Sequence, residues 1–214
     1  MEVKSFEFNP FAENTYILFD ETRECVVIDP GCYEKDEQQA LISFIQDNQL
    51  TVSQVINTHC HIDHVLGNAF VKDYFKVDLL LNRIEEPLLR AVKTYAPNYG
   101  FNRYQDSEPD KFIDENDKIT FGKQTLDILF VPGHSPGHLA FYHAETKTLI
   151  GGDVLFQNSI GRTDLYGGDY DTLIESIHTK LFALPDEVTV YPGHGPTTTI
   201  GFEKKTNPFC AITH

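Results

Sequence analysis

The sequence lacks any long apolar run. No stretch approaches the roughly 20 apolar residues that a membrane-spanning helix needs. The first ten residues mix charged with apolar positions, unlike a signal peptide. We therefore expect neither a membrane segment nor a secreted precursor.

Positive charge is also scarce. The chain has 17 Lys and Arg against 32 Asp and Glu, a net charge of -15, and its basic residues are scattered. A nucleic-acid-binding protein usually presents a basic face, so we expect no nucleic-acid partner and no role at a membrane surface. The four cysteines show no paired spacing, which predicts reduced thiols and a cytoplasmic location.

The 214 residues suffice for one substantial domain, and no low-complexity tract or linker interrupts them. We expect a single domain over residues 1–214. Hydrophobic patterning predicts strands over 3–8, 15–19, 24–29, 52–57, 79–81 and 188–191, strand pairs over 118–130 and 139–150, and helices over 35–48, from the end of the histidine run to about 75, over 84–95 and over 170–181. Strands and helices mixed along the whole chain favour a layered α/β fold.

The richest feature is the run THCHIDH at residues 58–64, which places three imidazoles and a carboxylate in six consecutive positions. In an extended segment, residues two apart project to the same side. His59 and His61 can therefore converge on one ion, and Asp63 continues that register. His64, adjacent to Asp63, must point elsewhere. One ion cannot use all four, so the run predicts a two-metal site.

Three further candidate ligands follow apolar runs: His134, Asp153 and His194. Glycine or proline precedes each and allows the backbone to turn sharply. Strands of one layered core that all end in such loops would deliver their ligands to one edge.

The seven candidates are too many for one ion but suit two ions about 3.5–4 Å apart. The natural division gives His59, His61 and His134 to the first ion. Asp63, His64 and His194 bind the second, and Asp153 bridges both. The two carboxylates, Asp63 and Asp153, are also assigned as catalytic. Open positions for water would mark a catalytic site. We expect two divalent ions, zinc in the first place, although these nitrogen and oxygen ligands also accept iron and manganese.

Further residues near the candidate site are interpreted as follows. Asp29 either orients a ligand or is an ordinary turn residue, and His138 is a candidate hydrogen-bonding group beside the site. The tyrosine-rich segment 95–110 either covers the active site or packs on the core as a surface loop. The remaining histidines, His143, His178 and His214, are expected to be structural or exposed.

The pattern resembles the metallo-β-lactamase fold, in its glyoxalase II-like branch. The resemblance rests on THCHIDH (58–64), PGHSPGH (132–138), GGD (151–153) and PGHG (192–195), in the family's order and over most of the chain. It implies an αβ/βα sandwich with metals at one edge between two sheets. Binuclear members of the family divide the seven ligands in the same way.

The resemblance further implies hydrolysis of a small thioester such as S-lactoylglutathione by a metal-bridging hydroxide. The leaving thiol, with a pKa of about 8.5, departs without an acid catalyst. Two departures bear on the substrate. We expect the chain to lack the C-terminal helical glutathione-binding domain of typical glyoxalase II. After the bridging aspartate it retains a basic residue, Arg162, but not the family's tyrosine. Arg162 either binds a substrate carboxylate or is an ordinary surface arginine.

Other functions fit the same motifs. Persulfide dioxygenases of this fold use one iron, two histidines and an aspartate, and carry a segment like Gly161-Arg162-Thr163-Asp164. A tRNA 3′-end nuclease is disfavoured by the acidity. A lactonase or β-lactamase, or a metal-binding protein without catalysis, would share the ligands. The sequence does not determine the oligomeric state.

Overall fold

The computed structural model describes residues 1–212, which group into two compact units. Unit 1 comprises Met1–Ile113 and Thr120–Thr125, and unit 2 comprises Asp114–Ile119 and the chain from Leu126 onward. Each unit has a six-stranded sheet. The single domain over 1–214 stays a prediction, and His214 lies outside the described residues. Within residues 1–212, no helix has the length and apolar character to cross a membrane.

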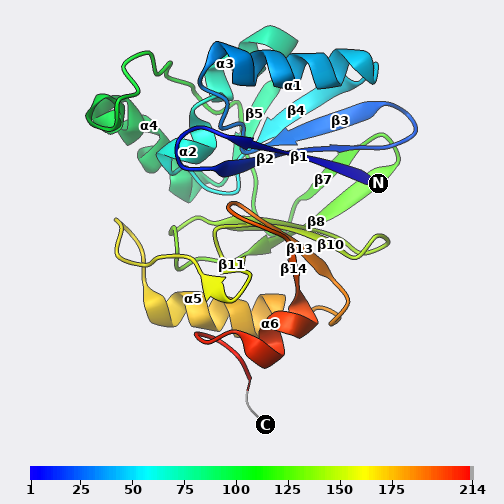
Figure 1. Ribbon diagram of the computed structural model, residues 1–214, viewed down its shortest axis with the longest axis vertical. Coiled ribbons are helices and arrows are strands. Elements are labelled where there is room, and N and C mark those ends of the chain that lie inside the picture. The colour runs from blue at the N-terminus through cyan, green and yellow to red at the C-terminus, as the bar shows by residue number, and fades with distance from the viewer. Residues whose placement is uncertain (213–214) are drawn as a thin grey trace. The chain divides into compact units, whose positions relative to one another are not determined.

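The sheet of unit 1 has the strand order β1-β2-β3-β4-β5-β6. β1, β2 and β3 are antiparallel, and β3 to β6 are parallel. Helices α1 and α3 lie along one face of it (Figure 1). The elements are β1 (Glu2–Phe8), β2 (Glu13–Phe19), β3 (Glu24–Ile28), α1 (Lys35–Asp47), β4 (Thr51–Ile56), α2 (Ile62–Val65), α3 (Asn68–Phe75), β5 (Asp78–Leu81), a 3-10 turn (Arg83–Glu85), α4 (Glu86–Tyr95), a second 3-10 turn (Ala96–Tyr99) and β6 (Lys111–Phe112).

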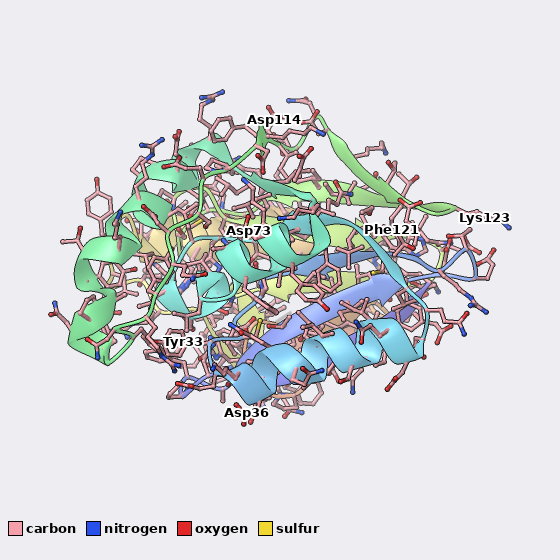
Figure 2. The ribbon with its side chains drawn as sticks, turned by 90° about the horizontal axis from the view of Figure 1, so that it is seen from above. Tyr33, Asp36, Asp73, Asp114, Phe121 and Lys123 are labelled. Atoms are coloured by element: carbon pink, nitrogen blue, oxygen red, sulfur yellow. The ribbon has the colours of Figure 1, made fainter. Side chains whose placement is uncertain are left out.

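The burial pattern of each element fits its position in the unit. β1, at the edge of the sheet, has mostly exposed and partly buried residues, whereas β2 is buried at six of its seven positions, which include residues of both its faces. In α1, Leu41, Ile42 and Ile45 form the buried stripe of an amphipathic helix. Figure 2 shows α1 and α3 side by side, with Asp36 and Asp73 labelled on them. The two helices cover the apolar core of the unit.

Parallel pairing of β3 and β4 brings two chain segments together at their carboxyl ends. Ile28 lies opposite Ile56, so Asp29 and Asn57, which follow them, meet at the same edge of the sheet. The main-chain N–H of Asp29 donates to the Ile56 carbonyl. The run 58–64 begins directly after Asn57, and its first histidine, His59, is therefore delivered to the same edge as Asp29.

The sheet of unit 2 has the order β14-β13-β10-β9-β8-β7, and α5 and α6 lie along one face of it (Figure 1). Residues 120–125 of its β7–β8 hairpin group with unit 1. Figure 2 labels Lys123 at the turn of that hairpin. The elements are β7 (Lys118–Phe121), β8 (Gln124–Phe130), β9 (Leu139–His143), β10 (Thr148–Gly152), β11 (Leu155–Phe156), β12 (Ser159–Ile160), α5 (Tyr170–Ser176), a π-helical turn (Ile177–Leu181), β13 (Thr189–Pro192), β14 (Thr198–Thr199) and α6 (Ile200–Thr206).

The strand directions of unit 2 deliver three ligands to one edge. β8 and β10 are both antiparallel to β9, and β10 is parallel to β13, so β8, β10 and β13 end at the same side. His134, Asp153 and His194 follow these three ends. The expectation that strand ends bring the ligands to one edge is thus confirmed within this unit.

The main elements lie where patterning predicts them. The helix predicted after the histidine run is two helices, because the helical conformation is interrupted at Leu66 and Gly67, between α2 and α3. Patterning does not predict α6, the short strands β6 and β14, or the short hairpin of β11 and β12. α6 has only seven residues, including Gly201 and Thr206, so its intrinsic helix propensity is low. Its buried residues, Ile200 and Glu203 among them, hold it in place.

Candidate metal centre

In unit 1, the histidine run has no regular secondary structure before Ile62, where α2 begins, and the backbone of His61 is extended. The ring centroids of His59 and His61 are 4.7 Å apart, as expected for residues two apart in an extended segment. The helical turn also brings His64 to 4.2 Å from His59, measured between ring centroids. Nε2 of His64 lies 3.6 Å from Oδ2 of Asp63. The turn therefore places these two adjacent side chains near one another, which an extended chain would not do.

Asp29 fixes the ring of His64. Its Oδ2 lies 3.1 Å from Nδ1 of His64, and its Oδ1 accepts the main-chain N–H of Thr58 at 2.7 Å. A carboxylate only accepts, so the His64 proton sits on Nδ1 and Nε2 keeps its lone pair for a metal. Asp29, His59 and His64 could also form a ligand set by distance alone. The oxygens of Asp29 already accept these donors, so we assign it to orientation.

His59 is oriented by the same network. The Thr58 hydroxyl donates to Asp29 Oδ2 at 2.6 Å, so its single proton is used. Its oxygen, 3.0 Å from Nδ1 of His59, must then accept the proton on that nitrogen. Nε2 of His59 is again the nitrogen with a lone pair. Of the two interpretations of Asp29, the orienting role agrees with the geometry.

Two buried glutamates adjoin the histidine run, and neither was identified from the sequence. Oε2 of Glu85, a fully buried residue, accepts the main-chain N–H of Cys60 at 2.8 Å. Glu13, also fully buried, accepts the Thr15 hydroxyl at 2.9 Å, and its Oε1 is 3.9 Å from Nδ1 of His64. Desolvation raises the pKa of Glu13 well above its usual value, although His64 opposes that rise. Nothing in the local sequence pattern distinguishes either glutamate from an exposed one.

In unit 2, one carboxylate oxygen lies between two imidazoles. Oδ2 of Asp153 is 3.5 Å from Nε2 of His134 and 3.5 Å from Nε2 of His194. His134 and Asp153 are buried. Nδ1 of His134 lies 2.8 Å from the main-chain oxygen of Arg162. A carbonyl only accepts, so the proton of a neutral His134 sits on Nδ1, and its unprotonated Nε2 lies on the side of Asp153.

Backbone conformation brings these groups together. Gly133, before His134, has φ +128°, and a Cβ there would lie 2.3 Å from the main chain of Leu173. Gly152, before Asp153, has φ +51°. Nε2 of His138 accepts the main-chain N–H of Asp153 at 3.1 Å. His138 thus holds the backbone of a candidate ligand, in agreement with the hydrogen-bonding role considered for it.

The observed separations fit metal ions. Zinc–nitrogen and zinc–oxygen bonds of about 2.0–2.2 Å place two donors of one tetrahedral ion about 3.4 Å apart. The His134–Asp153, His194–Asp153 and His64–Asp63 pairs lie at 3.5, 3.5 and 3.6 Å. These distances exceed ordinary hydrogen bonds. Together with the unprotonated Nε2 atoms inferred for His59, His64 and His134, they show that the donor types present suit a divalent ion.

The other residues considered from the sequence are Arg162, the segment 95–110 and Cys60. The Arg162 side chain, 62% exposed, pairs through Nε and Nη2 with both oxygens of Asp164 at 2.7 and 2.8 Å. In segment 95–110, Tyr95 and Tyr104 pack against the core of unit 1, whereas Tyr99 is exposed. Cys60 is fully buried, and burial raises the pKa of its thiol well above the usual value.

The other histidines have structural contacts. His143 is buried, with Nδ1 2.8 Å from the Thr146 hydroxyl. His178 is exposed, with Nε2 2.8 Å from the carbonyl of Cys210. Both agree with the expectation that these residues are structural or exposed.

Comparisons with known proteins agree with this geometry. Residues 8–194 match the model of the metallo-beta-lactamase superfamily. Hydroxyacylglutathione hydrolase GloC of Haemophilus influenzae is 36% identical over 211 residues, 98% of each chain. The similarity therefore covers both ligand clusters.

Three solved structures resemble the chain. BLEG-1 B3 metallo-beta-lactamase is 36% identical (TM-score 0.89; 99% of this chain and 100% of that one). TTHA1623 in a di-iron-bound form is 35% identical (TM-score 0.86; 97% and 100%). ETHE1 from Myxococcus xanthus is 25% identical (TM-score 0.81; 99% and 85%).

Proposed function

The chain belongs to the metallo-beta-lactamase superfamily, and from this premise we propose that it is a binuclear metallohydrolase that cleaves a small thioester such as S-lactoylglutathione. Membership confirms the expected layered α/β fold of the metallo-β-lactamase type. With the histidine and aspartate clusters, it also implies that the chain is a hydrolase of this superfamily that binds divalent metal.

The observation that carries the proposal is the position of Asp153. Its Oδ2 lies 3.5 Å from Nε2 of both His134 and His194, the two histidines that the sequence assigns to different ions. A carboxylate flanked in this way suits a bridge between two ions. We retain the assignment of His59, His61 and His134 to the first ion, and of Asp63, His64 and His194 to the second.

Two divalent ions bound there would supply an acidified water as nucleophile and would polarise the thioester carbonyl. The protein's own residues orient the ligands: Asp29 holds His64, Thr58 holds His59, and the Arg162 carbonyl holds His134. We propose zinc as the metal, with iron or manganese as alternatives. TTHA1623, which was solved with two irons, supports the count of two.

The proposed substrate rests on GloC and on the leaving group. GloC is a hydroxyacylglutathione hydrolase. A thiol with a pKa of about 8.5 leaves as thiolate without a positioned acid. Arg162 is the proposed contact for a substrate carboxylate, which would have to displace Asp164 from its guanidinium group. We further propose a cytoplasmic location, which the four buried, unpaired thiols support.

The second candidate function is persulfide dioxygenation by one iron. It is favoured by the similarity to ETHE1 and by the segment Gly161-Arg162-Thr163-Asp164. β-Lactam hydrolysis is a third candidate because BLEG-1 is a metallo-beta-lactamase. A nuclease has less support because the net charge is -15, and a non-catalytic metal-binding protein has less support because the similar proteins include the hydrolase GloC.

Elemental analysis of the purified protein, run beside S-lactoylglutathione hydrolysis, tests the proposal. We expect two metal ions per chain and thioester hydrolysis without oxygen consumption. One iron per chain with oxygen consumption on glutathione persulfide would establish the dioxygenase instead. A fully metallated protein that turned over β-lactams and no thioester would also overturn the assignment.

A further inference from the structure

We propose that Glu203 and Asn207, at the C-terminal end of unit 2, are positioning residues for the metal ligands His134 and Asp153. The inference rests on the proposed metal centre and concerns residues that no motif marks. Both residues are buried: Glu203 is fully inaccessible and Asn207 is 1% exposed. They reach the ligands through the hairpin of β11 and β12.

This hairpin has both of its ends at the metal centre. Asp153 lies two residues before β11, and Gly161 and Arg162 follow β12. The N–H of Gly161 donates to the carbonyl of Val154 at 3.2 Å and closes the base. The carbonyl of Arg162 then accepts the Nδ1 proton of His134. Displacement of the hairpin would therefore move a ligand at one end and the acceptor that orients another ligand at the other end.

The base of the hairpin is closely packed. A Cβ on Gly161 would lie 1.9 Å from the carbonyl oxygen of Asp153 and 3.1 Å from Cβ of His134. Any side chain at position 161 would force these segments apart. A shift of the hairpin is consequently transmitted to both ligands instead of being absorbed by empty space.

The tip of the hairpin is held by Glu203 and Asn207. Oε2 of Glu203 accepts the main-chain N–H of Asn158 at 3.0 Å. Nδ2 of Asn207 donates to the Ser159 carbonyl at 3.0 Å and to Glu203 Oε2 at 2.8 Å. The hydroxyl of Thr198 donates to Oε1 of Glu203. The buried carboxylate thus accepts three donors, which compensates its loss of hydration.

The hairpin needs this support. Each of its strands has two residues, and two-stranded hairpins are marginally stable on their own even when longer. Asn158 at its turn has φ +55°, a conformation in the left-handed region. The contacts with Glu203 and Asn207 define the position of the tip, and the paired strands carry that position to the base.

The test compares Glu203→Ala and Asn207→Ala with the wild type and with Thr199→Ala. Thr199 is the N-cap of α6 and accepts the N–H of Phe202, so its removal destabilises the same helix without touching the hairpin. Two measurements on the metal-free protein report on position: amide hydrogen exchange at Asn158 and Gly161, and the tautomer of His134 from ¹⁵N NMR. Zinc affinity, from competition with a chelator, is the third.

In Glu203→Ala and Asn207→Ala we expect faster exchange at both amides, loss of the single Nδ1–H tautomer of His134, and zinc affinity about tenfold weaker. Glu203→Gln, whose amide oxygen can still accept from Asn158 and Asn207, should largely restore all three. Thr199→Ala should lower Tm without these changes.

The inference would be overturned if Glu203→Ala matched Thr199→Ala in exchange at Gly161, in the His134 tautomer and in zinc affinity. If Glu203→Ala does not fold, the same measurements on Asn207→Ala and Glu203→Gln test the inference: Asn207→Ala should show the three changes and Glu203→Gln should not. The proposed function is tested separately, by hydrolysis of the thioester. The amide exchange, the His134 tautomer and the zinc affinity do not depend on the substrate, so they test this inference even if the wild type hydrolyses no thioester.

Discussion

In unit 1 the candidate ligands come from one short stretch of chain, and side chains orient them. Asp29 and the Thr58 hydroxyl hold the imidazoles, and Glu85 holds the backbone between them. In unit 2 the ligands come from three separate strand ends, and main-chain groups take a larger part. The Arg162 carbonyl orients His134, and the N–H of Asp153 is held by His138.

This difference determines how each cluster can be disturbed. A single substitution can remove an orienting side chain such as Asp29. No substitution can remove the Arg162 carbonyl, which responds only to movement of the hairpin that carries it. Unit 1 should therefore be sensitive to changes beside the ligands, and unit 2 to more distant changes that shift the backbone.

The largest effect is expected from the ligands themselves. His59→Ala removes one ligand of one proposed ion, whereas Asp153→Ala removes the group proposed to bind both. Each should abolish hydrolysis and leave the circular dichroism spectrum nearly unchanged. Metal content should fall further in Asp153→Ala. Asp127→Ala, which removes a surface ion pair of unit 2, is the control and should retain both metals. Wild-type hydrolysis by either ligand variant would refute the site assignment.

The next effect concerns orientation in unit 1. Asp29 has φ +50°, which asparagine also tolerates, so Asp29→Asn changes the hydrogen bonding with little backbone strain. Loss of the carboxylate that holds Nδ1 of His64 should weaken metal binding by about 10- to 100-fold. Competition with a chromogenic chelator measures this, with exposed Asp36→Asn as the control. An affinity equal to that of the control would show that Asp29 is only a turn residue.

A smaller effect, on stability, should follow in unit 1 from the loss of Glu85. Glu85→Ala leaves the buried N–H of Cys60 without this acceptor, which should lower the free energy of unfolding by about 1–3 kcal/mol. Urea denaturation measures it. Glu86→Ala, at the next position, breaks only an ion pair with Arg90 and should cost less than about 1 kcal/mol. Equal losses in the two variants would contradict a bracing role for Glu85.

The same contrast explains what could be predicted from the sequence. The run at 58–64 is recognisable because its ligands are contiguous, and His134, Asp153 and His194 because each follows an apolar run with a glycine or proline before it. The family motifs add the fold. Most strands and longer helices follow from patterning, since their buried residues recur at the expected spacing.

The orienting groups could not be predicted because tertiary pairing creates them. Asp29 meets Thr58 only because β3 and β4 are parallel and in register. The Arg162 role belongs to a carbonyl, which every residue has, and Glu85 and Glu203 resemble other glutamates in the sequence. α6 could not be predicted because its intrinsic helix propensity is low; burial of Ile200 and Glu203 stabilises it.

The smallest effect concerns Arg162 and its proposed contact with substrate. The Arg162 guanidinium lowers the pKa of Asp164 to about 2, so the pair is fully formed above the usual aspartate pKa near 4 and is lost as the pH falls through about 2. Between pH 6 and 9 a substrate carboxylate must therefore compete with Asp164. Asp164→Asn should lower KM for S-lactoylglutathione, by at most about fivefold because the pair is exposed to solvent. A thioester without a carboxylate should show no change, nor should exposed Asp171→Asn with either substrate. A higher KM in Asp164→Asn would mean that Asp164 holds Arg162 in its working position instead of competing for it.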